Sequence, residues 1–145
     1  MPIQDKLPNK LSSLLSVALK EFLKIESDPR FEINMTAWVE YNPRVKRCQV
    51  CFAGAALVGR CGVSRKRADV WGDDLNHVKA GSPLGRKASA LNELRVGDIH
   101  AAAHSLGIAL PRGIHNQSVA EYAISPEGWK KDIRKLIQYL RDHNL

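Results

Sequence analysis

The sequence predicts a mainly α fold with a minor strand component, arranged as a single domain over residues 1–145. Three observations lead to this prediction. The chain is long enough to bury a core without help from a disulfide or a structural metal. Apolar residues recur at helical spacing along most of the chain. Only residues 31–40 alternate with the two-residue period of a strand.

The first and last helices have the clearest pattern. Asn9 can cap a helix that runs to Glu26 and ends because Asp28 precedes a proline. Ser125-Pro126 is a start signal for a final helix. The apolar stripe of that helix is Trp129, Ile133, Leu136, Ile137 and Leu140. Four basic residues fall largely outside the stripe: Lys130, Lys131, Arg134 and Arg141.

The most apolar stretch is residues 48–59, CQVCFAGAALVG, which we expect to form a central buried Cys/Ala/Gly helix. A helix that is apolar nearly all round is typical of a buried element. Gly54 inside this helix would cost roughly 1 kcal/mol relative to alanine, so its packing must compensate. Gly59 or Gly62 can end the helix.

Residues 31–40 read as one half-buried strand, since apolar and polar side chains alternate over the whole segment. Two segments are candidates for its pairing partner, residues 67–70 and residues 108–110.

Shorter helices are expected between the central helix and the final one. One is predicted over residues 73–79, a second begins at Ser82-Pro83 and runs to Leu94, and a third covers residues 99–106 after Asp98. Proline, glycine and asparagine predict an irregular loop over residues 108–119.

The net charge of +7 is concentrated in one part of the chain. Residues 44–95 hold eleven Lys or Arg against four acids, which accounts for the whole excess. A positive field of this kind attracts nucleic acid, nucleotides or an acidic protein face, although a solvated basic surface has the same composition. The candidate partner-binding or phosphate-binding residues are Arg44, Lys46, Arg47, Arg65, Lys66, Arg67, Arg86 and Lys87.

The cysteines and histidines include the residue types of a zinc site, but their spacing along the sequence is not typical of one. Cys48, Cys51 and Cys61 could supply three thiolates for zinc, with a histidine as fourth ligand. The intervening residues suit a helix interior, however, and the spacing to His77, His100 or His104 is not standard, so buried free thiols are preferred. A nucleophilic Cys48 has basic neighbours but no identifiable base partner.

Other catalytic patterns are also weak. His100 and His104 share a helix face but lack the glutamate of a zinc protease, and helix capping accounts for Asp73 and Asp74 without a nuclease metal site. Residues 81–87 do not have the spacing of a P-loop, though the start of a helix there can bind an anion. Residues 101–108 resemble the start of a helix-turn-helix, but Pro111 disfavours the recognition helix. We therefore expect no enzyme, no resident metal and no cofactor.

No segment has the pattern of a membrane span or a secretion signal. The longest apolar run, residues 51–59, is far shorter than the roughly 20 residues that cross a bilayer. Three cysteines, an odd number, fit reduced thiols better than disulfides. A cytoplasmic protein with no membrane partner is expected.

Three motifs lie between residues 33 and 97. They are Ile33-Asn34-Met35 with Trp38, then Cys48-x-Val50-Cys51-x-Ala53-Gly54-Ala55, then Leu91-Asn92-x-Leu94-Arg95-x-Gly97. Together they resemble a group of small uncharacterised proteins encoded by tailed bacteriophages. Phage proteins of this size often bind and redirect one host protein, including CRISPR and other defence complexes. The resemblance therefore implies binding to a host complex in the cytoplasm of an infected bacterium.

The leading functional hypothesis is a phage-encoded inhibitor or adaptor whose basic surface docks on a host protein or nucleoprotein complex. The alternative is a nucleic-acid or nucleotide-binding module in which the same cations contact phosphates. Binding to nucleic acid with no host protein present would separate the two.

Overall fold

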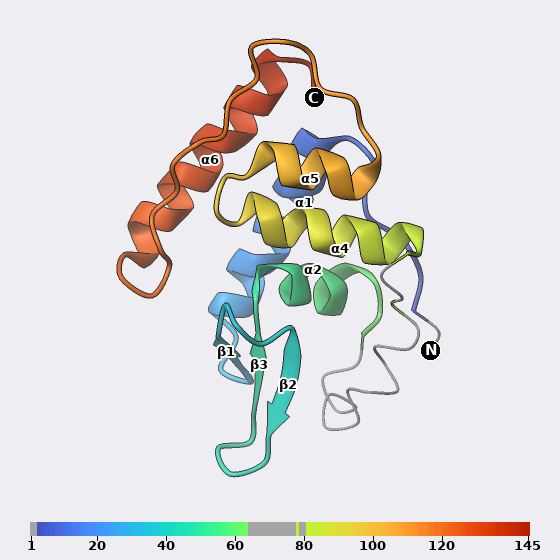
Figure 1. Cartoon of the computed structure of the whole chain (residues 1–145). Helices are drawn as coiled ribbons and strands as arrows, with labels where there is room; N and C mark the ends of the chain where they lie inside the picture. Colours follow the sequence, from blue (N-terminus) through green and yellow to red (C-terminus); the bar gives the residue numbers. More distant parts are fainter. Residues whose placement is uncertain (1–2, 64–77, 79–80) are drawn as a thin grey trace.

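The computed structural model describes residues 3–63, 78 and 81–145. Within them, helices gather at one end and a small sheet lies at the other (Figure 1). The elements in chain order are α1 (Leu11–Glu26), β1 (Phe31–Ile33), β2 (Val39–Asn42), β3 (Arg47–Val50), α2 (Phe52–Arg60), α4 (Pro83–Leu94), α5 (Ile99–Leu106) and α6 (Pro126–Asp142). The predicted mainly α fold with a minor strand component is confirmed.

The single strand expected over residues 31–40 is wrong, because the segment forms two strands separated by a turn. The Asn34 Oδ1 accepts hydrogen bonds from the backbone N–H and the hydroxyl of Thr36, at 3.0 and 2.6 Å, and this closes the turn. The sheet order is β1-β3-β2, with β3 parallel to β1 and antiparallel to β2.

β1 and β2 both pair with β3, residues 47–50, which is neither of the two candidate segments. Residues 108–110 form no strand, and residues 67–70 lie outside the described residues. All but Val78 of the helix expected over residues 73–79 lies outside them as well.

The central helix is confirmed as a buried element, but it begins at Phe52 rather than at Cys48. Cys48 belongs to β3, and Cys51 is the N-cap, whose Sγ accepts a hydrogen bond from the Gly54 N–H over 3.3 Å. Gly62 follows the helix with a φ of 80°. A Cβ at Gly54 would overlap the Trp38 carbonyl, so glycine allows α2 to lie directly against the chain entering β2.

Three buried aromatic rings meet in the core, and the half-buried ring of Tyr122 packs against them. Trp129 of α6 lies 4.9 Å from Phe22 of α1 and 5.2 Å from Phe52 of α2, measured between ring centroids. Tyr122, from the segment before α6, lies 5.7 Å from Trp129. The contacts of Trp129 with Phe52 and Tyr122 are edge-to-face, and the contact with Phe22 is tilted. Aromatic pairs of this kind gain about 0.5–1.5 kcal/mol beyond burial of their area. They join the ends of the chain to its middle.

Local capping sets most helix starts. The side chains of Ser82, Asp98 and Ser125 accept hydrogen bonds from the backbone N–H three residues on, at 3.0, 3.0 and 3.2 Å, as the sequence predicts. The expected Asn9 cap is wrong: Lys10 is the N-cap of α1, and its side chain makes no capping hydrogen bond.

No helix lies between the end of α5 at Leu106 and the start of α6 at Pro126. Residues 101–108 are therefore not followed by the recognition helix of a helix-turn-helix.

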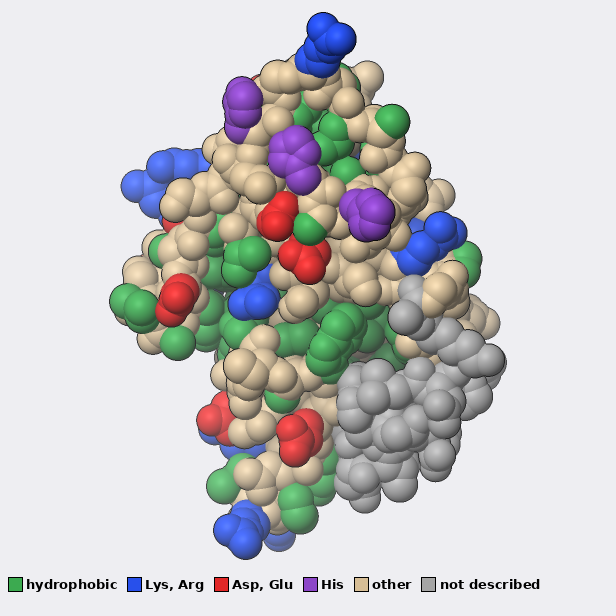
Figure 2. Space-filling view, viewed as in Figure 1, with side chains coloured by type: hydrophobic (Ala, Val, Ile, Leu, Met, Phe, Trp, Pro, Cys, Tyr) green, Lys and Arg blue, Asp and Glu red, His purple; other side chains and the backbone are tan. Residues whose placement is uncertain are grey.

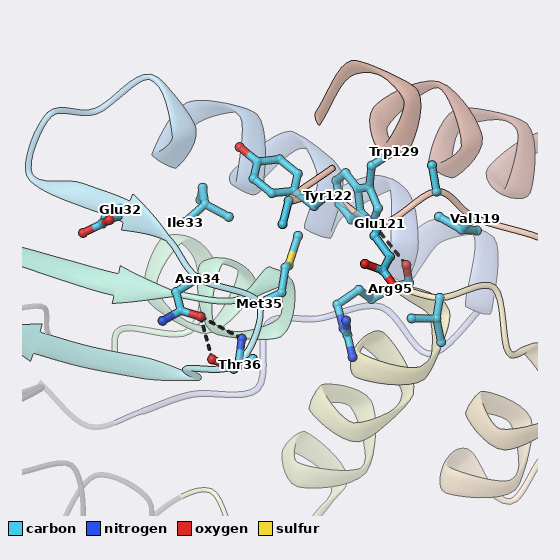
Figure 3. Close-up of a pocket in the computed structure, with 13 residues that line it drawn as sticks. Glu32, Ile33, Asn34, Met35, Thr36, Arg95, Val119, Glu121, Tyr122 and Trp129 are labelled. Atoms are coloured by element: carbon cyan, nitrogen blue, oxygen red, sulfur yellow. Dashed lines mark hydrogen bonds between the residues drawn. The ribbon is translucent and has the colours of Figure 1, made fainter. Parts of the chain in front are cut away.

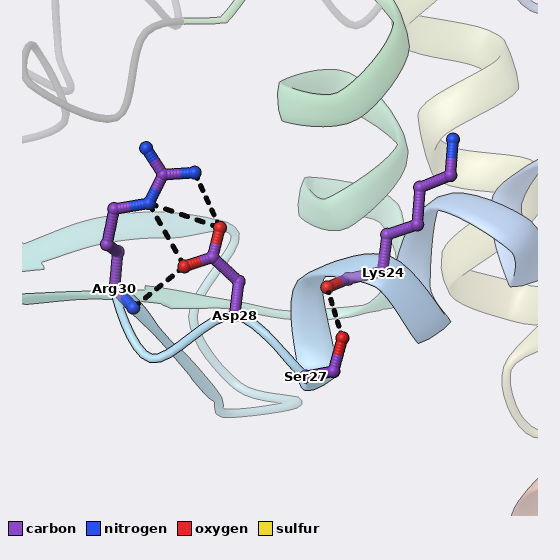
Figure 4. A network of polar contacts seen from close by, with 4 residues as sticks. All are labelled: Lys24, Ser27, Asp28 and Arg30. Atoms are coloured by element: carbon purple, nitrogen blue, oxygen red, sulfur yellow. Dashed lines mark hydrogen bonds and ion pairs between the residues drawn. The ribbon is translucent and has the colours of Figure 1, made fainter.

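The turn between α1 and β1 is held by polar contacts (Figure 4). The Ser27 hydroxyl donates to the Lys24 carbonyl over 3.0 Å, closing the end of α1. Asp28 accepts from the backbone N–H of Arg30 and from its guanidinium, the latter at 2.6–3.1 Å. Arg30 is therefore paired with the Asp28 carboxylate.

Of the helices described, none combines the length and the apolar character needed to cross a bilayer.

Candidate functional site

The β2–β3 hairpin presents two of the expected basic residues at its tip. Arg44 and Lys46 are exposed, and Val45 between them is 53% exposed. The Asn42 Oδ1 accepts from the Arg44 N–H over 3.0 Å, and Lys46 has a φ of 54°, which together define the turn. The hairpin extends away from the helices, and Lys or Arg side chains are visible at the same end of the surface (Figures 1 and 2).

Arg47 is held against the sheet rather than presented at the tip. Its guanidinium donates to the Phe31 carbonyl over 2.7 Å, and its Nε is buried without a hydrogen-bond partner among the described residues. Arg47 is therefore tied to β1, and the exposed positive charge of the hairpin comes from Arg44 and Lys46.

Lys87 is not part of an exposed basic surface, and this corrects the sequence analysis. It is buried, and its Nζ donates to the Asp5 carboxylate over 2.8 Å and to the Leu7 carbonyl over 2.7 Å. Arg86 is exposed and lines a cavity of about 270 Å³ at the start of α4. Arg65, Lys66 and Arg67 lie outside the described residues.

The three cysteines are buried free thiols, one in β3 and two at the ends of α2. Cys48 lies in β3, Cys51 at the start of α2 and Cys61 at its end. Burial raises the pKa of the Cys51 and Cys61 thiols, which opposes formation of the thiolate that a nucleophile or a zinc ligand requires. No cluster of three metal-ligating side chains occurs in the described ranges.

The two histidines of α5 are exposed. The His100 Nε2 lies 3.0 Å from the Ile114 carbonyl, a hydrogen bond that connects α5 to the loop after it. His100 thus has a structural contact that accounts for its position.

A groove that the sequence did not indicate lies where three segments meet (Figure 3). Its volume is about 460 Å³. The turn after β1, the end of α4 and the segment before α6 provide its walls, together with Trp129. The apolar and aromatic side chains of the lining are Ile33, Met35, Val96, Val119, Ala120, Tyr122, Ala123 and Trp129.

Arg95, at the end of α4, contributes a basic side chain to the groove lining. Its Nε is buried and has no hydrogen-bond partner in the described part of the chain. Its backbone carbonyl is fixed, because it accepts a hydrogen bond from the Trp129 Nε1 over 3.1 Å. In the view of Figure 3 the Arg95 guanidinium lies below Met35, and Glu121 is drawn beside Arg95. Sequence reasoning counted Arg95 only as part of the basic excess.

One wall of the groove is held by a buried lysine. Lys130 contacts the carboxylates of Glu26 and Glu127, at 2.5 and 2.9 Å, and the Tyr122 hydroxyl donates to Glu26 over 2.5 Å. Burial and the hydrogen bond to Glu26 raise the pKa of Tyr122. These contacts fix the segment before α6 against α1.

Comparisons with known proteins found no match: the sequence matched no protein-family model and no curated protein, and the structure matched no solved structure. Function is therefore inferred from the geometry and charge of the described residues.

Proposed function

We propose that this chain is a small binding protein that contacts an acidic surface of another protein through the tip of its β2–β3 hairpin. The observation that carries the proposal is the exposed sequence Arg44-Val45-Lys46 on a hairpin that extends from the helical body (Figure 1). An exposed apolar side chain between two cations can be buried on docking while the cations meet carboxylates.

The hairpin is preorganised for such a contact. Asn42 pairs with Arg47 across the antiparallel ladder, and the side chain of Asn42 closes the turn. A loop held in its bound conformation loses less conformational entropy on association, so more of the contact energy appears as affinity.

A protein partner is favoured over a nucleic acid by the composition of the tip. Residues 43–46 contain no aromatic side chain on which a base could stack. With the resemblance to phage proteins, the partner we propose is a host complex, such as a defence complex, in the cytoplasm of the infected bacterium. Inhibition or redirection of that complex would be the outcome of binding.

The test is an affinity pull-down from bacterial lysate, with and without nuclease, read by mass spectrometry. The hairpin variant is Arg44→Glu/Lys46→Glu. The control variant is Lys131→Glu/Arg134→Glu, which makes the same change of charge at exposed positions of α6. We expect one near-stoichiometric protein that survives nuclease, is retained by the control and is lost with the hairpin variant.

Three results would contradict the proposal. The partner could persist with the hairpin variant, no stoichiometric partner could be found, or only nucleic acid could co-purify with all proteins lost after nuclease. The third result would favour the phosphate-binding alternative.

A further inference from the structure

The groove lined by Arg95 and the tip of the β2–β3 hairpin are separate surfaces. The groove takes Asn34, Met35 and Thr36 from the turn that leads into β2, whereas residues 43–46 follow β2. The two surfaces therefore lie at opposite ends of the same strand. An inference about the groove goes beyond the proposed function, since it holds whether or not the hairpin binds a partner.

The walls of the groove are suited to an apolar side chain. Ile33, Met35 and Tyr122 are half-buried and line an open volume of about 460 Å³. Cavities of this size with apolar and aromatic walls are typical of ligand sites. A bulky aliphatic or aromatic side chain would cover apolar area that now faces water.

Arg95 brings a positive charge to the groove, and its buried Nε has no hydrogen-bond acceptor among the described residues. Its Nε–H is removed from water, yet no described residue accepts a hydrogen bond from it. The Nε itself has almost no accessible surface, but the terminal guanidinium nitrogens of Arg95 are not among the buried atoms that lack a partner. An incoming carboxylate would pair with these nitrogens, and such charge-assisted hydrogen bonds are stronger than neutral ones. The fold supplies no acid for this purpose, because no ion pair joins Arg95 to Glu32 or Glu121 of the lining.

Glu121 is exposed at the mouth of the groove, where water and salt screen its charge more than that of the buried Arg95 nitrogen. Glu32, the second lining acid, is half-buried, and no ion pair joins it to Arg95. The two acids therefore weaken the attraction of a carboxylate to Arg95 without removing it.

The rim indicates a macromolecular occupant rather than a free small molecule. Val96 lines the groove and is 46% exposed, and Ile124, next to the lining residue Ala123, is 80% exposed. They are two of the three large apolar side chains exposed in the described ranges. A small ligand would leave both in water, whereas a bound chain passing over the rim would cover them.

We propose that the groove binds a peptide segment of a partner protein in which an apolar side chain is followed by an acidic one. The apolar side chain fills the space between Met35 and Tyr122, and the carboxylate accepts from the Arg95 guanidinium. The flanking residues of the segment lie over Val96 and Ile124.

The probe is a set of fluorescein-labelled nonapeptides in which Leu, Phe or Trp is followed by Asp or Glu in a Ser/Gly background. A matched set carries Asn or Gln instead of the acid. Affinities are measured by fluorescence polarisation with the full chain, and sites by amide shifts of the isotope-labelled protein. We expect acidic peptides to bind about tenfold more tightly than their amide counterparts. The shifts should be centred on residues 33–36, 95–96 and 119–123.

Variants separate the groove from other surfaces. Arg95→Gln should abolish the preference for acidic peptides, whereas Arg112→Gln, at an exposed position outside the lining, should keep it. Arg44→Glu/Lys46→Glu should bind the peptides as the wild type does, so failure of the hairpin proposal would not be mistaken for failure of this one. Circular dichroism checks that each variant is folded.

The proposal is overturned if acidic and amide peptides bind equally, if the shifts lie outside the groove, or if no peptide binds at millimolar concentration. Binding of 2-naphthoate at the same amides with no peptide binding would also overturn it, since the groove would then be a small-molecule site.

Discussion

The indole Nε1 of Trp129 donates a hydrogen bond to the backbone carbonyl of Arg95 over 3.1 Å, and this bond joins the first turn of α6 to the end of α4. The last carbonyls of a helix have no partner within the helix, so the indole satisfies a group that would otherwise need water. The same bond fixes the backbone from which the Arg95 side chain enters the groove.

Trp129→Phe should therefore reduce the free energy of unfolding by about 2 kcal/mol or more, because it removes core volume and this hydrogen bond together. The control is Trp38→Phe, at a half-buried tryptophan whose indole makes no hydrogen bond with the described residues. Urea unfolding followed by circular dichroism measures both. Equal losses for the two variants would show that the bond to Arg95 adds nothing.

Lys130→Met should be strongly destabilising, by about 2–4 kcal/mol, because it leaves the Glu26 carboxylate without its cation in a partly buried site. Burial alone would lower the pKa of Lys130, but hydrogen bonds to Glu26 and Glu127 outweigh it and raise the pKa. The neighbouring Lys131 is exposed, so Lys131→Met should change the unfolding free energy little. Similar effects of the two changes would contradict the structural role of Lys130.

Alkaline pH should weaken the fold through Tyr122. The pKa of Tyr122 is raised in the folded state, by burial and by the hydrogen bond to Glu26, whereas an unfolded tyrosine ionises near pH 10. The contribution of Tyr122 is therefore complete below about pH 10 and is lost as the pH rises further. Tyr122→Phe should show a smaller loss of unfolding free energy between pH 9 and pH 11 than the wild type, and Tyr41→Phe should follow the wild type. An unchanged pH profile in Tyr122→Phe would refute this.

Lys87→Met should loosen the segment before α1, because Lys87 connects that segment to α4 through Asp5 and Leu7. Hydrogen exchange of the backbone amides of residues 4–9 should become about tenfold faster, since one buried charged contact is lost. Arg86→Met removes the same charge one residue earlier at an exposed position and should leave the exchange rates unchanged. Faster exchange in both variants would point to charge rather than to the specific contact.

Gly54→Ala should cost about 3 kcal/mol or more, although alanine favours helices, because its methyl group would overlap the Trp38 carbonyl. Gly81→Ala is the matched change, since a methyl group there meets no described atom within 4 Å. Thermal unfolding of both variants measures the difference. A stable Gly54→Ala would mean that α2 can move away from the sheet at little cost.

Local signals in the sequence predicted the parts of the fold that depend on local contacts. Ser82, Asp98 and Ser125 cap their helices through residues three positions on, so the pattern and the contact coincide. Residues 48–50 were misassigned because a short apolar run fits a buried helix and a buried strand equally well. Pairing with β1 and β2, which lie on either side, decides for a strand.

The candidate site was less predictable because it depends on contacts between distant segments. The sequence predicts Lys87 to be a surface cation, because its contacts with Asp5 and Leu7 join segments that are far apart in the chain. The groove joins Met35, Arg95 and Tyr122, which no spacing in the sequence brings together. Three of the candidate cations, Arg44, Lys46 and Arg86, are exposed as the sequence predicts.

The position of β3 in the sheet has a consequence for synthesis. β3 is the last of the three strands along the chain, yet it lies between the other two, which do not pair with each other. During translation, a nascent chain that has emerged only as far as Lys46 holds two strands with no neighbour to bond to. The sheet forms only when residues 47–50 leave the ribosome, so the hairpin tip becomes ordered at the same moment as the strand that follows it.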